Sequence, residues 1–126
     1  MGRKIATVVA GVAAWFILVS AIDIAMRRFW PDYAANFAAM TFTLPMMIAR
    51  LSESTVALVV AALLAARMAP GWSAAAASFG VVMLVIFLPI HYSLWSKFPV
   101  WYHAYFLGSL IVAPVFVASV IRSERS

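Results

Sequence analysis

The stretch IATVVAGVAAWFILVSAIDIAM, residues 5–26, decides the fold of this chain. Its one charged residue is Asp23, and basic pairs bound it on both sides, Arg3 and Lys4 before it and Arg27 and Arg28 after it. A helix needs about 20 apolar residues to cross the hydrocarbon core of a bilayer. Residues 5–26 are therefore predicted to form a membrane-spanning helix.

A cleaved signal peptide is the alternative interpretation of this stretch. A basic pair, an apolar core and the sequence Val19-Ser20-Ala21 would allow cleavage after Ala21. However, the apolar run of about 18 residues is longer than a typical signal-peptide core. The basic pair at its far end is also typical of a helix end. We therefore expect the segment to be kept as a helix.

Three further stretches are long enough to span a membrane: 42–67, 73–89 and 100–121. The second is the hardest to place, because its uninterrupted apolar part, 54–66, has only about 13 residues and is too short to cross. The helix must extend back towards Leu44, and this extension brings Arg50 and Glu53 to membrane depth or just under the interface. The sequence thus predicts an all-α fold, a four-transmembrane-helix bundle in one membrane domain, 1–126.

The composition supports this class and excludes others. Of the 126 residues, 67% are hydrophobic and only 10% are charged, and the mean hydropathy is +1.04, far from the balance of soluble domains. The net charge of +5 comes from basic residues at the ends of apolar runs, where they suit anionic lipid rather than nucleic acid. Because the chain has no cysteine, disulfides, thiolate metal sites and cysteine nucleophiles are excluded.

Lysine and arginine positions predict that both termini lie inside, because basic residues favour the inner face. The inner residues on this assignment are Arg3, Lys4, Arg67, Arg122 and Arg125; the outer ones are Arg27, Arg28 and Lys97. The two outer connections are rich in tryptophan and tyrosine, which prefer the membrane–water interface. We expect six of these aromatic side chains to act as interface anchors: Trp30, Tyr33, Tyr92, Trp95, Trp101 and Tyr102.

The connection before the last helix also carries a distinctive motif. Residues 91–103 read HYSLWSKFPVWYH, which resembles the H-Y-x-x-W-x-x-F-P-x-W-Y-H stretch of a group of small bacterial inner-membrane proteins of unknown function. The resemblance implies a bacterial cytoplasmic membrane and four helices. It supplies no information on activity and assigns no catalytic residues.

Ionisable residues from all four predicted helices fall at similar depth, at a rise of about 1.5 Å per residue. They are Asp23, Arg50, Glu53, His91 and His103. Ionisable groups inside a membrane are costly unless they are paired or hydrated, so this layer is a candidate ligand or proton site. Glu53, His91 and His103 are also the residues that could ligate a divalent metal ion. No other cofactor is predicted, and no motif assigns catalytic residues.

The same layer also has a purely structural interpretation. Asp23 and Arg27 are four residues apart and Arg50 and Glu53 three apart, so each acid has a basic partner on its own helix. Small residues recur every fourth position, as close helix packing requires: Ala6, Ala10 and Ala14; Ala57, Ala61 and Ala65; Ala76 and Gly80; Ala104 and Gly108. The first function hypothesis is thus an accessory membrane component that self-associates or joins a larger complex. The alternative is a metal, proton or small-ligand site that acts in transport or in a small membrane enzyme.

Overall fold

The computed structural model describes residues 2–125 and, among these, the side chains of residues 2–122. Its elements, in chain order, are α1 (Gly2–Phe29), α2 (Pro31–Phe37), α3 (Leu44–Met68), α4 (Ala75–Ser93), the 3₁₀ helix η1 (Trp95–Lys97) and α5 (Val100–Arg125). No strand occurs within residues 2–125. The predicted all-helical class is therefore confirmed. The side chain of Arg125, one of the predicted inner basic residues, lies outside the described part.

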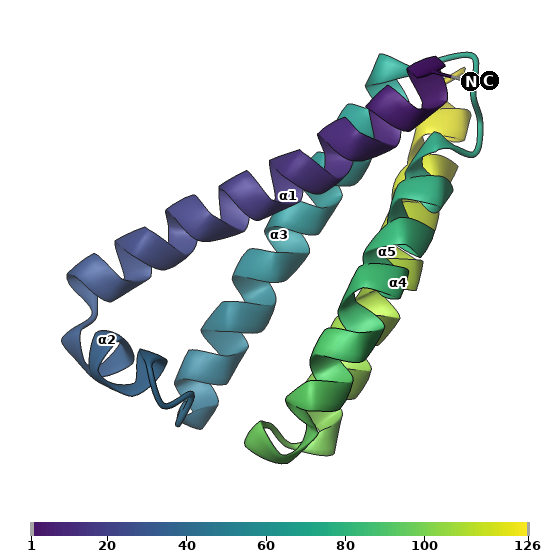
Figure 1. The fold of residues 1–126 in the computed structure, drawn as a ribbon. Helices are drawn as coiled ribbons and strands as arrows, with labels where there is room; N and C mark the ends of the chain where they lie inside the picture. Colours follow the sequence, from purple (N-terminus) through teal and green to yellow (C-terminus); the bar gives the residue numbers. More distant parts are fainter. Residues whose placement is uncertain (1, 126) are drawn as a thin grey trace.

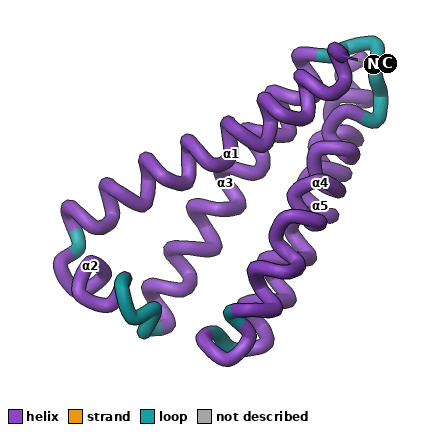
Figure 2. The backbone as a smooth tube through the Cα atoms, viewed as in Figure 1, coloured by secondary structure: helices purple, strands orange, loops and turns teal. Residues whose placement is uncertain are grey.

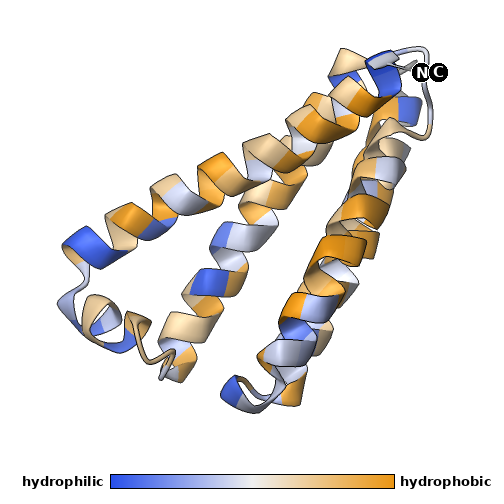
Figure 3. Cartoon of the chain, viewed as in Figure 1, coloured by the Kyte–Doolittle hydropathy of each residue, from blue (hydrophilic) through white to orange (hydrophobic). Residues whose placement is uncertain are grey.

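Four helices, α1, α3, α4 and α5, are long and apolar enough to cross a membrane. They run along the length of the molecule and are joined by short connections, so both termini lie at one end, with α2 and η1 at the other (Figures 1 and 2). Strongly hydrophilic residues gather near the two ends and on the half of α3 that lies towards α2 (Figure 3).

Prolines mark where three helices begin. Pro31 and Pro45 occupy the first turns of α2 and α3, and Pro99 directly precedes α5. The first turn of a helix tolerates proline, because its amide has no partner within the helix. The sequence Pro70-Gly71 similarly separates α3 from α4.

Two connections are more helical than the sequence predicts. The third long helix was expected to end at about Pro89, but α4 continues through Pro89 to Ser93. A proline removes one helical hydrogen bond, and the helix resumes beyond it, with the Leu94 amide donating to the Ile90 carbonyl at 3.1 Å. The short helix α2 also replaces part of the expected interfacial loop. The extended α4 keeps His91 on a helix.

The expected stripes of small residues pack inside the bundle on α3 and α4. Ala57, Ala61 and Ala65 of α3 are fully buried, as are Ala76 and Gly80 of α4. On α1 the prediction is wrong by one position. In that part of α1 the buried residues are Thr7, Gly11 and Trp15, whereas Ala6 is exposed and Ala10 and Ala14 are partly exposed. A shift of one residue turns a helix face by about 100°.

Glycines mark the closest contacts between helices. A Cβ atom placed on Gly80 would lie 2.6 Å from the Leu110 carbonyl oxygen and 2.8 Å from Pro114 Cγ of α5. On Gly11 it would lie 2.8 Å from the Phe79 ring of α4. On Gly108 it would meet nothing within 4 Å. The close α1–α4 contact lies in the half near the termini, and α1 diverges from α4 towards α2 (Figure 1).

Candidate functional site

The carboxylate of Asp23 is the centre of a polar cluster between α1, α2 and α3. Tyr33 of α2 donates a hydrogen bond from its hydroxyl to Asp23 Oδ1 at 2.5 Å. Arg27 Nε lies 3.6 Å from Asp23 Oδ2, and Arg50 Nη1 lies 3.7 Å from Asp23 Oδ1. Hydrogen bonds to an ionised group are stronger than neutral ones. This cluster therefore joins three helices that the sequence pattern treats separately.

Arg50 connects the same cluster to α5. Its Nη1 donates to the Tyr33 hydroxyl at 2.8 Å, and its Nε donates to the Tyr102 hydroxyl at 3.3 Å. The guanidinium also lies over the Phe42 ring, 4.6 Å from its centroid. Among the described residues, the ion pair of Arg50 within 4 Å is with Asp23 of α1. The expected pairing of Arg50 with Glu53 on its own helix is thus replaced by a pairing between helices.

The six predicted interface anchors fall into two groups. Tyr33 and Tyr102 are buried and bind Arg50. The other four side chains are exposed or partly exposed: Trp30, Tyr92, Trp95 and Trp101. Burial and the Asp23 carboxylate raise the pKa of Tyr33 above its usual range, so its hydroxyl remains a hydrogen-bond donor at neutral pH.

Glu53 and Ser54 carry the least satisfied polar atoms of this region. Glu53 and Asp23 line the same hollow between α1 and α3. Within the described residues, however, Glu53 Oε2 and Ser54 Oγ are buried and have no hydrogen-bond partner. Trp15 Nε1 donates to the Ser54 carbonyl at 3.3 Å, which fixes α1 against α3 at this level. Unpaired buried polar atoms are rare in native proteins and call for a physical reason.

His91 of α4 and His103 of α5 form a buried pair. Their Nδ1 atoms are 2.7 Å apart, so one ring donates a hydrogen bond to the other. His103 Nε2 lies 3.3 Å from the Trp95 carbonyl oxygen. The Trp95 ring stacks on His103 with centroids 4.6 Å apart, and Phe106 packs against His91. Both imidazoles are held within α4, α5 and η1.

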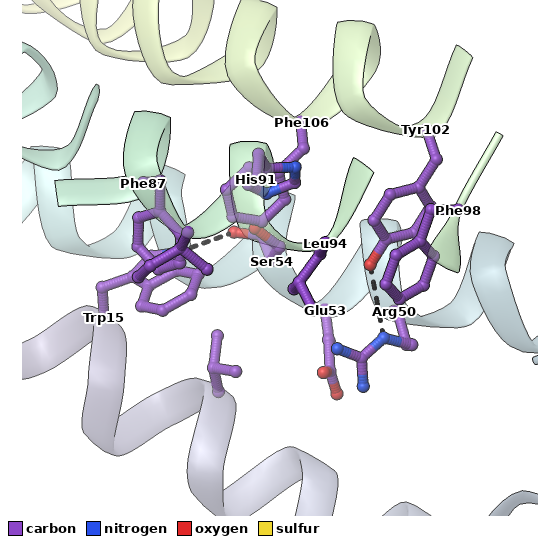
Figure 4. A pocket seen from close by; sticks show the side chains of 12 residues that line it. Trp15, Arg50, Glu53, Ser54, Phe87, His91, Leu94, Phe98, Tyr102 and Phe106 are labelled. Atoms are coloured by element: carbon purple, nitrogen blue, oxygen red, sulfur yellow. Dashed lines mark hydrogen bonds between the residues drawn. The ribbon is translucent and has the colours of Figure 1, made fainter. Parts of the chain in front are cut away.

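A cavity of about 120 Å³ separates the histidine pair from the Asp23 cluster. Side chains of α1, α3, α4 and α5 and of the connection before α5 line it (Figure 4). They are Trp15, Val19, Arg50, Glu53, Ser54, Phe87, Ile90, His91, Leu94, Phe98, Tyr102 and Phe106. Glu53 also borders a more open hollow beside Asp23 and Arg27. The structure therefore brings the predicted polar layer together, but as two clusters with a cavity between them.

The predicted metal ligands do not form one set. Within the part of the chain that the structure describes, no group of three or more histidine, aspartate or glutamate side chains is placed to hold a metal ion. His91 and His103 face each other across 2.7 Å, which is a hydrogen-bond distance. The hydrogen bonds of the two histidine rings go to each other and to the Trp95 carbonyl rather than to Glu53.

Sequence reasoning missed Ser54 and misjudged Tyr33 and Tyr102. Ser54 lies three residues before Ala57, on the face of α3 that the alanine stripe marks as buried, so the helical period contained this signal. The two tyrosines carried no such signal. Tyrosine suits both an interface and a buried site with a polar partner.

No protein-family model, curated protein or solved structure matches this chain. The geometry of the polar clusters and of the cavity is therefore the basis for a functional proposal.

Proposed function

We propose that this chain is an integral membrane protein that binds a small hydrogen-bonding molecule in the cavity between α1, α3, α4 and α5. The observation that carries the proposal is the pair of unpartnered atoms, Glu53 Oε2 and Ser54 Oγ. Both residues line the cavity, and they are only 7% and 4% exposed. A buried polar atom without a partner costs about 1–3 kcal/mol. A ligand that bonds to both atoms recovers this energy.

The membrane placement rests on the four apolar helices and on the outward-facing aliphatic side chains, such as Ile17, Val85 and Val112. We propose the bacterial cytoplasmic membrane with both termini inside, from the basic residues and from the motif of residues 91–103. This orientation puts α2, η1 and the cavity in the outer half of the bilayer.

The position of the cavity supports binding rather than passage across the membrane. Towards the termini, alanines and large apolar side chains fill the space between the helices, among them Ala61, Ala65, Phe79 and Leu110. A path for ions or protons through this half would need polar groups or water. The site therefore serves a molecule that enters the half of the bundle nearer α2 and η1.

Mass spectrometry of the protein released from its own membrane in mild detergent tests this proposal. Ser54→Met fills the cavity with a flexible apolar side chain, and Ser52→Met is its matched control, because Ser52 is exposed on the same helix. We expect a fixed additional mass on the wild type and on Ser52→Met that is absent from Ser54→Met.

A wild-type chain without additional mass would contradict the binding proposal. It would favour the first sequence hypothesis, an accessory component in which the polar clusters only hold the helices together. In that case the same spectra would report whether the chain is found as an oligomer or within a larger membrane complex.

A further inference from the structure

From the walls of the cavity we infer its ligand class: a six-membered aromatic ring that carries a hydroxyl group and belongs to a lipid-soluble molecule. The inference rests on the proposed function and specifies the chemistry of the molecule bound there. Three features lead to it, namely the aromatic walls, the polar edge contributed by α3, and the aliphatic opening between α1 and α4.

Aromatic side chains, His91 included, form half of the cavity lining. Trp15 meets Phe87 edge to face, with ring centroids 5.0 Å apart, and Phe87 lies at the same centroid distance from Phe106. Phe98 and Tyr102 stack with centroids 4.2 Å apart. Aromatic pairs at such distances attract each other beyond the effect of burial alone. A flat aromatic guest makes the same contacts with this wall, whereas water does not.

The size of the cavity limits the guest to one ring. An enclosed apolar cavity of about 150 Å³ accommodates benzene. The cavity here is smaller, about 120 Å³, but it is open on one side, so a ring can bind with one edge at the opening. Drug-sized ligands occupy pockets of about 300–1,000 Å³. A single six-membered ring is thus the largest rigid body that the cavity accepts, and any further part of the molecule must extend out of the opening.

The polar atoms lie together on one edge of the cavity. Arg50, Glu53 and Ser54 all come from α3 and line it, and Figure 4 shows Arg50 beside Tyr102 and Ser54 near His91. A carboxylate oxygen needs a donor, while a serine hydroxyl both donates and accepts. A ring hydroxyl can donate to Glu53 Oε2 or pair with Ser54 Oγ. A plain hydrocarbon ring leaves both unpaired.

The opening of the cavity is mostly aliphatic. The lining residues that are partly or fully exposed are Val19 of α1, Ile90 of α4, Leu94 directly after α4, and Arg50 of α3. The helices α1 and α4 diverge towards α2 and η1 (Figure 1). A ligand that enters between them passes apolar side chains on both sides, as a lipid-soluble molecule does when it moves in from the hydrocarbon.

Two fluorinated rings, 4-fluorophenol and fluorobenzene, test the inference. Each is titrated into the full chain in lipid nanodiscs, and its binding is measured by fluorine NMR. After correction for partitioning into empty nanodiscs, we expect saturable binding of 4-fluorophenol that is about three- to tenfold tighter than that of fluorobenzene, as one added hydrogen bond predicts. Ser54→Ala should remove most of this preference and leave fluorobenzene binding unchanged. Ser52→Ala, the exposed control, should change neither.

Glu53→Gln supplies a second variant of nearly the same shape, and it should also reduce the preference for the phenol. Equal binding of the two rings, absence of saturable phenol binding, or an unchanged preference in both Ser54→Ala and Glu53→Gln would overturn the inference. If no phenol binds while the wild type still carries an additional mass, the ring assignment fails and the proposed function stands. If both signals are absent, both proposals fail.

Discussion

Replacement of Gly80 by alanine tests how closely α4 packs against α5. The added methyl group would lie 2.6 Å from the Leu110 carbonyl oxygen and 2.8 Å from Pro114 Cγ. The oxygen belongs to the backbone and the proline ring is rigid, so neither can rotate away. To restore ordinary van der Waals contact, α4 and α5 must separate by about 0.8 Å.

The magnitude follows from two opposing effects. Overpacking of this kind costs about 1–3 kcal/mol, and a gap of 0.5–1 Å removes about a quarter to a half of the dispersion energy of the contacts beside it. Alanine in place of glycine within a helix recovers about 0.5–1 kcal/mol. We therefore expect Gly80→Ala to lower the free energy of unfolding by about 1–2 kcal/mol.

Gly108→Ala is the matched control, because a methyl group at Gly108 meets nothing within 4 Å. Its unfolding free energy should rise by about 0.5–1 kcal/mol through helix propensity alone. Gly11→Ala should fall between the two, since its obstacle is a side chain, Phe79, rather than backbone.

Unfolding in mixed micelles with increasing dodecyl sulfate, followed by circular dichroism, measures these differences. The reasoning is refuted if Gly80→Ala is as stable as the wild type. It is also refuted if Gly108→Ala loses as much stability as Gly80→Ala, because the loss would then not depend on the distance between α4 and α5.

Three further predictions concern the Asp23 cluster and use the same unfolding assay. Tyr33→Phe removes a hydrogen bond to a carboxylate and should lower the free energy of unfolding by about 2 kcal/mol. Its control, Tyr92→Phe, should leave the free energy of unfolding unchanged, because Tyr92 is 85% exposed; equal effects would contradict the role of Tyr33. Folding raises the pKa of Tyr33, so the unfolded chain loses this proton first, and the free energy of unfolding should fall as the pH rises above the ordinary tyrosine pKa of about 10. Tyr33→Phe should flatten that fall, and an unchanged slope would contradict the raised pKa. Asp23→Asn should cost about 2–3 kcal/mol, because it leaves Arg50 without its ion pair, while Asp32→Asn on the exposed face of α2 should cost less than about 0.5 kcal/mol.

The helices and the polar layer could be predicted from sequence because both depend on position along single helices. The length of an apolar run determines whether it can span a membrane, and the rise per residue brings Asp23, Glu53 and His91 to a common depth. The alanine stripe of α3 was predictable for the same reason. It repeats within one helix and needs no information about the neighbours.

The partners of the polar groups could not be predicted, because they depend on how helices are rotated against each other. Sequence spacing offers Glu53 as a neighbour of Arg50, but the orientation of α1 brings Asp23 within 3.7 Å of the guanidinium. The long arginine side chain also reaches hydroxyl groups on α2 and α5. The position of α2 follows from these contacts rather than from any periodicity in its seven residues.

The contact between Gly80 and Leu110 also has a meaning in terms of hydrogen bonding. The carbonyl of Leu110 would normally accept a bond from the amide four residues later, but that residue is Pro114, which has no N–H. In hydrocarbon no water replaces this donor. The Cα–H group of a glycine packed against the oxygen supplies a weak one. Gly80 and Pro114 are therefore coupled through this carbonyl: Pro114→Ala would restore its helical donor and remove the contact with the proline ring, but the Leu110 oxygen would still exclude a larger residue at position 80.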